Sequence, residues 1–109
     1  MPITRKVLYG KNLGCSVADG LTASGQAITG SGTFHGFIIK CDGTNDVTVN
    51  VYDNTSAAGT QLIPDDSVFD GTIKLNAVSF SPGVFFDTGI YVEITCAGAV
   101  EVKALYNAD

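Results

Sequence analysis

The segment from Asp42 to Asp46 gathers oxygen-bearing side chains that could bind a hard metal ion. Asp42, Thr44, Asn45 and Asp46 surround Gly43. Carboxylate and amide oxygens are the ligands that Ca²⁺ takes in proteins. The spacing is not that of an EF-hand loop, and turns commonly have this composition. We therefore expect a plain turn and no metal, with calcium binding as the alternative.

A second acidic motif, Asp87-Thr88-Gly89, follows an apolar run that ends in Phe85 and Phe86. An apolar pair before Asp-Thr-Gly resembles the motif of the aspartic proteases, in which two facing carboxylates share a proton and activate water. Ile90 stands where that family has Ala or Ser, and only 20 residues follow Gly89. No apolar pair followed by Gly-Arg occurs downstream. We interpret the motif as a turn between two strands, with the protease as the alternative.

His35 is the only histidine in the chain and stands in an apolar run after Phe34. A nucleophile would need this histidine as a hydrogen-bonded base, and no Cys or Ser is placed beside it by sequence. We expect a strand histidine with its hydrogen bonds satisfied. The sequence therefore predicts a structural or binding module rather than an enzyme, without catalytic residues, metal or cofactor.

Composition predicts one folded domain. The 109 residues are 45% hydrophobic and only 16% charged, which is too apolar for a disordered chain. There is no run of about 20 apolar residues, so we expect no membrane partner. The first ten residues lack the apolar core of a signal peptide, so we expect a chain made and kept in the cytoplasm. Three dispersed cysteines, Cys15, Cys41 and Cys96, indicate buried free thiols, with a Cys41–Cys96 disulfide as the alternative.

Charge is unevenly distributed along the chain. Arg5, Lys6 and Lys11 precede Asp19, the first acid, so the first 18 residues carry +3. The remainder has three lysines and eleven acids, which gives −8. Such asymmetry is typical of a basic arm that reaches an acidic partner, and equally of an edge strand protected by charge. Nucleic-acid binding is not expected, because the basic cluster is small and the body would repel phosphate.

The alternation of apolar and polar residues predicts short β-strands throughout. Val47, Val49 and Val51 alternate with polar neighbours, and the run from Phe34 to Cys41 precedes them. The turn formers between these two runs predict a hairpin. Residues 90–96 and 100–106 alternate in the same way around Ala97-Gly98-Ala99, which predicts a second hairpin.

The strand after Ile73 contains a change of period. Apolar residues stand at odd positions up to Ala77 and at even positions from Val78, which predicts a β-bulge between these two residues. Ser81-Pro82-Gly83-Val84 predicts a turn. Phe85 and Phe86 are adjacent, so one of them must point away from the core. We infer that Phe85 contacts a partner.

About eight short strands and no helical periodicity predict an all-β protein. The expected fold is a single-domain antiparallel β-sandwich, of which the jelly roll is one form. We expect residues 1–20 to form an N-terminal arm or edge strand and residues 21–109 to form the sandwich. Partner contacts are expected on the arm, at Arg5, Lys6, Val7, Leu8 and Tyr9, and at Phe85.

Two segments resemble a recurrent type of small structural protein from tailed bacteriophages. The first runs from Gly36 to Thr60 and contains Asp-Gly-Thr-Asn-Asp-Val-Thr-Val at residues 42–49 and Val-Tyr-Asp-Asn-Thr-Ser at residues 51–56. The second is the ending from Gly89 to Tyr106. The resemblance implies a β-sandwich of the virion, and specifically a capsid decoration or cement protein. It further implies a homo-oligomer, dimer or trimer, that binds the major capsid protein on the outside of the head. A tail, neck or fibre component that binds a receptor or another tail protein is the alternative.

Overall fold

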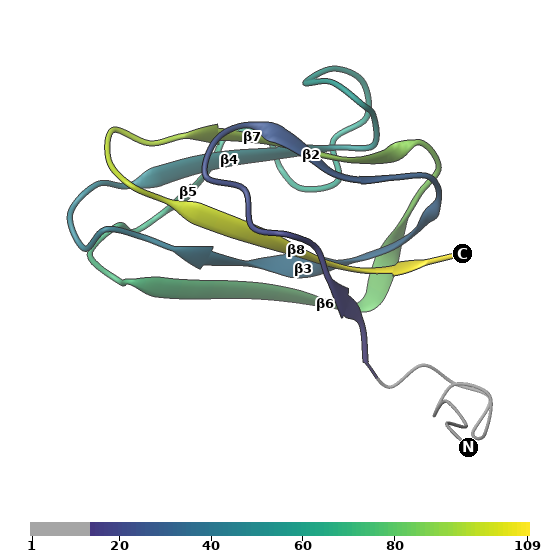
Figure 1. Ribbon diagram of the computed structural model, residues 1–109, viewed down its shortest axis with the longest axis horizontal. Coiled ribbons are helices and arrows are strands. Elements are labelled where there is room, and N and C mark those ends of the chain that lie inside the picture. The colour runs from purple at the N-terminus through teal and green to yellow at the C-terminus, as the bar shows by residue number, and fades with distance from the viewer. Residues whose placement is uncertain (1–13) are drawn as a thin grey trace.

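The computed structural model describes residues 14–109, and these form an all-β sandwich (Figure 1). Eight strands build two antiparallel sheets of four. Sheet A has the order β1-β8-β3-β6 and sheet B the order β2-β7-β4-β5. The strands are β1 (Ser16–Val17), β2 (Gly25–Thr29), β3 (Gly32–Lys40), β4 (Val47–Tyr52), β5 (Ser67–Phe69), β6 (Leu75–Phe86), β7 (Gly89–Thr95) and β8 (Glu101–Ala108).

The chain changes sheet at every connection except β4–β5, and this strand order is that of a jelly roll. The predicted single-domain β-sandwich is therefore confirmed. Ser16 and Val17 pair with Tyr106 and Leu105, so within residues 14–109 sheet A begins at Ser16. Within residues 14–109 there is no helix long and apolar enough to cross a membrane.

The two predicted hairpins are wrong. β3 pairs with β6 and β8, whereas β4 pairs with β5 and β7, so the strands joined by residues 41–46 lie in opposite sheets. The same holds for β7 and β8. Each of these four strands has one strongly apolar face. If two consecutive strands formed a hairpin, their apolar faces would lie side by side on the same surface of one sheet. Placing the strands in facing sheets instead buries these faces against each other.

The β-bulge lies in β3, so its predicted position at Ala77–Val78 is wrong. Phe34 pairs with Tyr106 and Gly36 with Leu105, which leaves His35 as the extra residue. Ala77 and Val78 are in regular register with β3. The apolar residues at odd positions in this part of β6 point to solvent, and Leu75 is 65% exposed. The strand therefore keeps the same face toward the core through Ala77 and Val78, without a bulge.

The predicted turn at residues 81–84 is also wrong, because β6 continues through this segment. Its pairing with β3 stops after Ser79, which lies opposite Gly36, and resumes at Val84, which lies opposite Phe34. Residues 80–83 therefore lie opposite the bulge of β3. Strand β6 accommodates Pro82 at this point because it is an edge strand with an irregular ladder.

The core lies between the two sheets and includes a cluster of phenylalanines. Phe34 and Phe37 are buried and stacked, with ring centroids 6.2 Å apart. Phe80 packs on Phe34 at 5.6 Å, and Phe69 of sheet B meets Phe37 edge-on at 5.5 Å. The remaining fully buried side chains are mostly branched aliphatic ones: Ile39, Val47, Val49, Val51, Ile90, Val92 and Val102.

All three cysteines are free thiols. Cys41 is buried, as predicted, and its burial raises the pKa of the thiol. Cys96 is half-buried. The prediction is wrong for Cys15, which is exposed. Its position next to the short edge strand β1 leaves it outside the core.

The bulge in β3 gives a first prediction. Gly36 has a φ of +122°, and a Cβ atom there would collide with the Val78 carbonyl and lie 2.9 Å from Ser79 Cα. Gly36→Ala should lower the free energy of unfolding by about 3 kcal/mol, because strain of the backbone adds to the clash. Urea unfolding measures the loss.

Gly30→Ala is the matched control. Gly30 has a similar φ of +113°, but a Cβ atom there would meet nothing within 4 Å. This variant should lose only about 1 kcal/mol, the cost of the left-handed backbone alone. Equal losses in the two variants would contradict the close approach of β3 and β6.

Candidate functional site

Phe85 is the most exposed large hydrophobic residue among residues 14–109, at 81%. Its neighbour Phe86 is buried at 1%, which confirms that one of the pair points away from the core. Because Phe86 is anchored in the core, Phe85 is held outward on a fixed strand. The other predicted contact residues, Arg5, Lys6, Val7, Leu8 and Tyr9, lie outside the described part of the chain.

A row of residues crosses sheet A at the level of Phe85. Thr33 of β3 lies between Phe85 of β6 and Asn107 of β8 in the strand register. Asn107 Nδ2 donates to the Gly14 carbonyl at 3.1 Å. Gly14 therefore lies at one end of this row and Phe85 at the other. We call Gly14, Thr33, Phe85 and Asn107 the docking row.

His35 lies beside the docking row, at the bulge. Its Nε2 is 3.0 Å from Asn107 Nδ2, and the side chain is half-buried. The predicted strand histidine with a satisfied hydrogen bond is thus confirmed. Asn107 bridges His35 and Gly14, so one amide connects the bulge of β3 to the start of the described chain.

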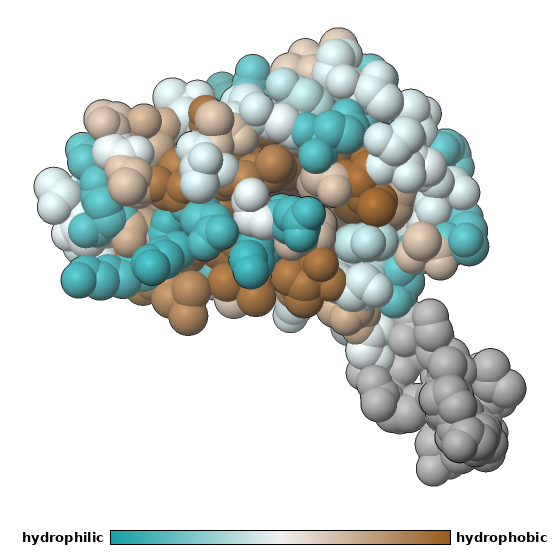
Figure 2. Space-filling model, viewed as in Figure 1, coloured by the Kyte–Doolittle hydropathy of each residue, from teal (hydrophilic) through white to brown (hydrophobic). Residues whose placement is uncertain are grey.

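The two faces of the sandwich differ in charge. The three lysines among residues 14–109 belong to sheet A or lead into it: Lys40 in β3, Lys103 in β8 and Lys74 directly before β6. Apolar side chains accompany them, since Leu75 pairs with Lys40 and Ile38 with Lys103. In Figure 2, hydrophobic residues gather along the lower side of the body, where Figure 1 places β6.

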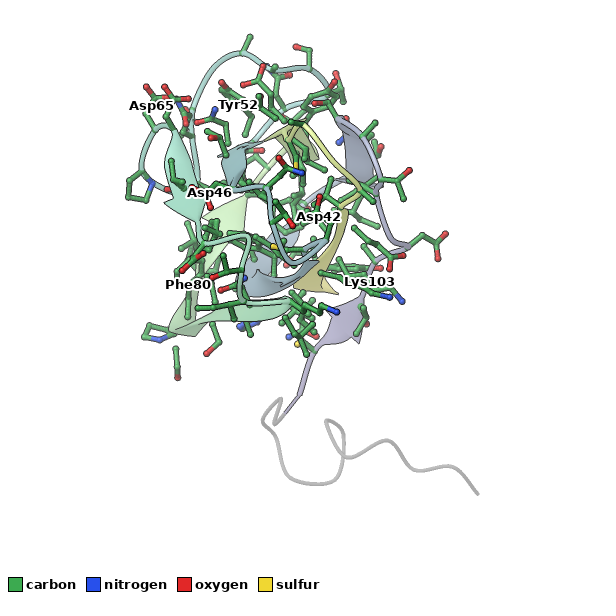
Figure 3. The ribbon with its side chains drawn as sticks, turned by 90° about the vertical axis from the view of Figure 1, so that its left-hand side faces the viewer. Asp42, Asp46, Tyr52, Asp65, Phe80 and Lys103 are labelled. Atoms are coloured by element: carbon green, nitrogen blue, oxygen red, sulfur yellow. The ribbon has the colours of Figure 1, made fainter. Side chains whose placement is uncertain are left out.

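The outer face of sheet B is polar and aromatic. Tyr52 and Tyr91 are cross-strand neighbours, as are Asn50 and Glu93. Asn50 Nδ2 donates to Glu93 Oε1 at 3.1 Å and to Asp66 Oδ1 at 2.9 Å. Partial burial and nearby carboxylates, Glu93 foremost, raise the pKa of Tyr52. Tyr52 and Asp65 lie together at one side of Figure 3, away from Lys103 of sheet A.

The Asp87-Thr88-Gly89 motif forms the turn between β6 and β7, as the structural interpretation predicted. Asp53, just after β4, holds this turn. Its carboxylate accepts hydrogen bonds from the backbone N–H groups of Asp87 at 3.0 Å and Thr88 at 2.8 Å. Partial burial raises the pKa of Asp53, but these amides outweigh it and lower the pKa below its ordinary value. Asp53 thereby fixes the end of β6 that carries Phe85.

The carboxylate of Asp42 is hydrogen-bonded by the loop that follows it. Asp42 Oδ1 accepts from the backbone N–H groups of Thr44 and Asn45, both at 2.8 Å, and Oδ2 accepts from Asn45 Nδ2 at 2.7 Å. The side-chain bond from Asn45 is the main cause that lowers the pKa of Asp42. The predicted turn is confirmed. In the described part of the chain, no three His, Cys, Asp or Glu residues are arranged to hold a metal ion.

A cavity of about 470 Å³ opens at the end of the sandwich shown in Figure 3, beside Asp42. It lies where loops cross between the sheets. Two lysines and two acids share its wall, so it presents no single charge to a ligand. The lining residues are Thr22, Lys40, Cys41, Asp42, Lys74, Ala99, Val100 and Glu101.

The Asp53 contact gives a second prediction. Because the folded-state pKa of Asp53 is lowered, its stabilisation is complete above the unfolded-state pKa of about 4 and is lost as pH falls through the folded value. Asp53→Asn should cost about 1–2 kcal/mol in unfolding free energy at neutral pH, a range that allows for solvent screening. Urea unfolding as a function of pH measures this.

The exposed Asp87 provides the control. The Asp87 carboxylate belongs to the same turn but accepts none of the hydrogen bonds described above. Asp87→Asn should therefore change the free energy of unfolding by no more than about 0.5 kcal/mol. The difference between the Asp53 variant and the wild type should shrink in acid. A difference that stays constant down to pH values well below 4 would contradict the role of the Asp53 carboxylate.

Comparison with known proteins adds no relative from which a function could be carried over. No protein-family model, curated protein or solved structure matches the chain. The fold and the surfaces described above are therefore the guides to its function. The docking row and the Tyr52–Tyr91 face are two surfaces of the described chain with features beyond those of an ordinary solvated sheet. Sequence reasoning found Phe85 but missed Asp53, Asn107 and the row itself.

Proposed function

We propose that the protein is a bacteriophage capsid decoration protein, which binds the outside of the head and stabilises the lattice of the major capsid protein. The observation that carries the proposal is the 81% exposure of Phe85, on a row of sheet A whose Asn107 also contacts Gly14. The jelly-roll strand order is consistent with it, because this fold recurs among viral capsid proteins. The resemblance of residues 36–60 and 89–106 to small phage structural proteins supports it further.

The docking row suits a rigid contact. Burying a Phe side chain fully is worth about 1.5–3 kcal/mol. Phe85 would incur little ordering cost on binding, because Phe86 is anchored in the core and Asp53 holds the following turn. The binding energy of one copy would be modest, but a capsid presents many equivalent sites and a homo-oligomer would engage several of them together.

The basic N-terminal segment would add electrostatic attraction. Arg5, Lys6 and Lys11 carry +3, while the rest of the chain carries −8. An acidic capsid surface would attract this segment and repel the acidic loops of sheet B, which would orient the docking row toward the lattice. The same charges make the attraction sensitive to salt, since the Debye length falls to about 3 Å at 1 M.

Co-sedimentation with capsids that lack the protein tests the docking row. Phe85→Ser should weaken binding by about tenfold or more, the equivalent of the lost burial. Deleting residues 1–11 should abolish binding, while unfolding in urea stays unchanged. Val68→Ser is the matched control, because Val68 is 61% exposed but belongs to sheet B. Capsid binding that survives the deletion unchanged would exclude the arm as a contact.

A second candidate function is a tail, neck or fibre component that binds a receptor or another tail protein. The outer face of sheet B favours it, because Tyr52 and Tyr91 lie side by side next to the hydrogen-bonded Asn50 and Glu93. Neighbouring tyrosines beside the carboxylate of Glu93 are suited to ligands with both apolar and hydroxyl surfaces. Such a protein would be present in few copies per particle, whereas a decoration protein covers the lattice.

A further inference from the structure

The four edges of the two sheets are unequally protected. An unpaired edge is a template for another strand, and proteins protect edges by shortening, bulging or charging them. β1 has two residues, and β2 has five with a register shift between Gln26 and Ile28. β5 has three residues and is bordered by Asp65, Asp66 and Asp70. In contrast, β6 has twelve residues and no charged side chain.

One side of β6 carries free pairing groups. Along an antiparallel strand, the backbone groups of successive residues point to opposite sides. The Lys74 carbonyl accepts a hydrogen bond from Cys41 N at 2.8 Å, and the Val78 carbonyl faces Gly36, so the even-numbered residues face β3. The N–H and C=O groups of Leu75, Ala77 and Ser79 therefore point away from β3. On that side, no strand from residues 14–109 pairs with β6.

The pairing groups end at Ser79. Beyond it, residues 80–83 lie opposite the bulge of β3, and Pro82 has no N–H to donate. The regular part of the edge is thus Leu75–Ser79. Leu75, Ala77 and Ser79 are exposed, so their side chains leave room for a neighbouring strand.

We propose that Leu75–Ser79 pairs antiparallel with the same segment of a second copy, about a two-fold axis at Ala77. In this register Leu75 lies opposite Ser79, and each hydrogen-bonded pair exchanges two bonds. The N–H and C=O groups of Leu75, Ala77 and Ser79, which point away from β3, would then face the same groups of the second copy. The two A sheets become one continuous sheet, and the contact is isologous, as in most homodimers.

A second copy fits this edge because the segment Leu75–Ser79 is complementary to itself about Ala77, and the neutral charge of β6 permits that copy to approach. Outside its first 18 residues the chain carries −8, so most of its surface repels an identical chain. The β6 edge is the long neutral exception. The two Lys74 side chains would stand at opposite ends of the paired segment, about 20 Å apart, which exceeds the Debye length at physiological salt. The pairing is independent of capsid binding, because Phe85 lies beyond the paired residues.

Sedimentation equilibrium of the full chain tests the dimer. The wild type should approach twice its 11.3 kDa mass as its concentration rises to about 200 µM. Ala77→Lys places two like charges opposite each other and should weaken the dimer about tenfold or more. Val68→Lys introduces the same charge on the edge strand β5 and should leave the mass unchanged. An equal mixture of Ala77→Lys and Ala77→Glu should restore the dimer.

Hydrogen exchange of the wild type provides a readout without mutation. The amides of Leu75, Ala77 and Ser79 should become protected as concentration rises, while those of Val68 and its neighbours should not. A monomer at all concentrations, a trimer, or a dimer that Ala77→Lys leaves intact would overturn the proposal. A dimer that is lost on deletion of residues 1–11 but kept in Ala77→Lys would also overturn it, and would assign the contact to the N-terminal segment.

Discussion

Phe34 and Phe37 stand three residues apart in one strand, yet both side chains point into the core. In a regular strand they would face opposite sides. His35 absorbs the difference as a bulge, and Gly36 allows β6 to approach closely. The aromatic contacts to Phe80 and Phe69 depend on this arrangement. So does the break in the β6 ladder, which separates the neutral segment Leu75–Ser79 from the segment that carries Phe85.

The sequence was sufficient to predict the fold class, the Asp42 and Asp87 turns and the opposite orientations of Phe85 and Phe86. It was insufficient for strand pairing, because alternation shows which face of a strand is buried and not which sheet contains it. The bulge was predicted at the wrong place for a related reason. Ile73 and Leu75 are apolar but exposed, so the change of period in the sequence did not mark a change in which face is buried. Asp53 and Asn107 act on residues far away in sequence, where no local pattern indicates their role.

The docking row and the neutral edge of β6 would act together in an assembled particle. A two-fold axis at Ala77 runs perpendicular to the joined sheet, so both docking rows would face the same side. They would lie at opposite ends of the dimer, because each Phe85 is distant from its copy's Leu75–Ser79 segment. Two rigid contacts on one face form a bivalent unit whose binding exceeds that of either contact. Such a unit could link neighbouring subunits of a lattice.

A decoration protein, as we propose for this chain, covers the capsid lattice. Its copy number in purified particles, quantified by mass spectrometry against the major capsid protein, tests this most directly. We predict a number comparable with that of the major capsid protein, as expected for an outer layer that follows the lattice. A handful of copies would contradict decoration and favour the tail, neck or fibre alternative. Absence from particles would contradict both.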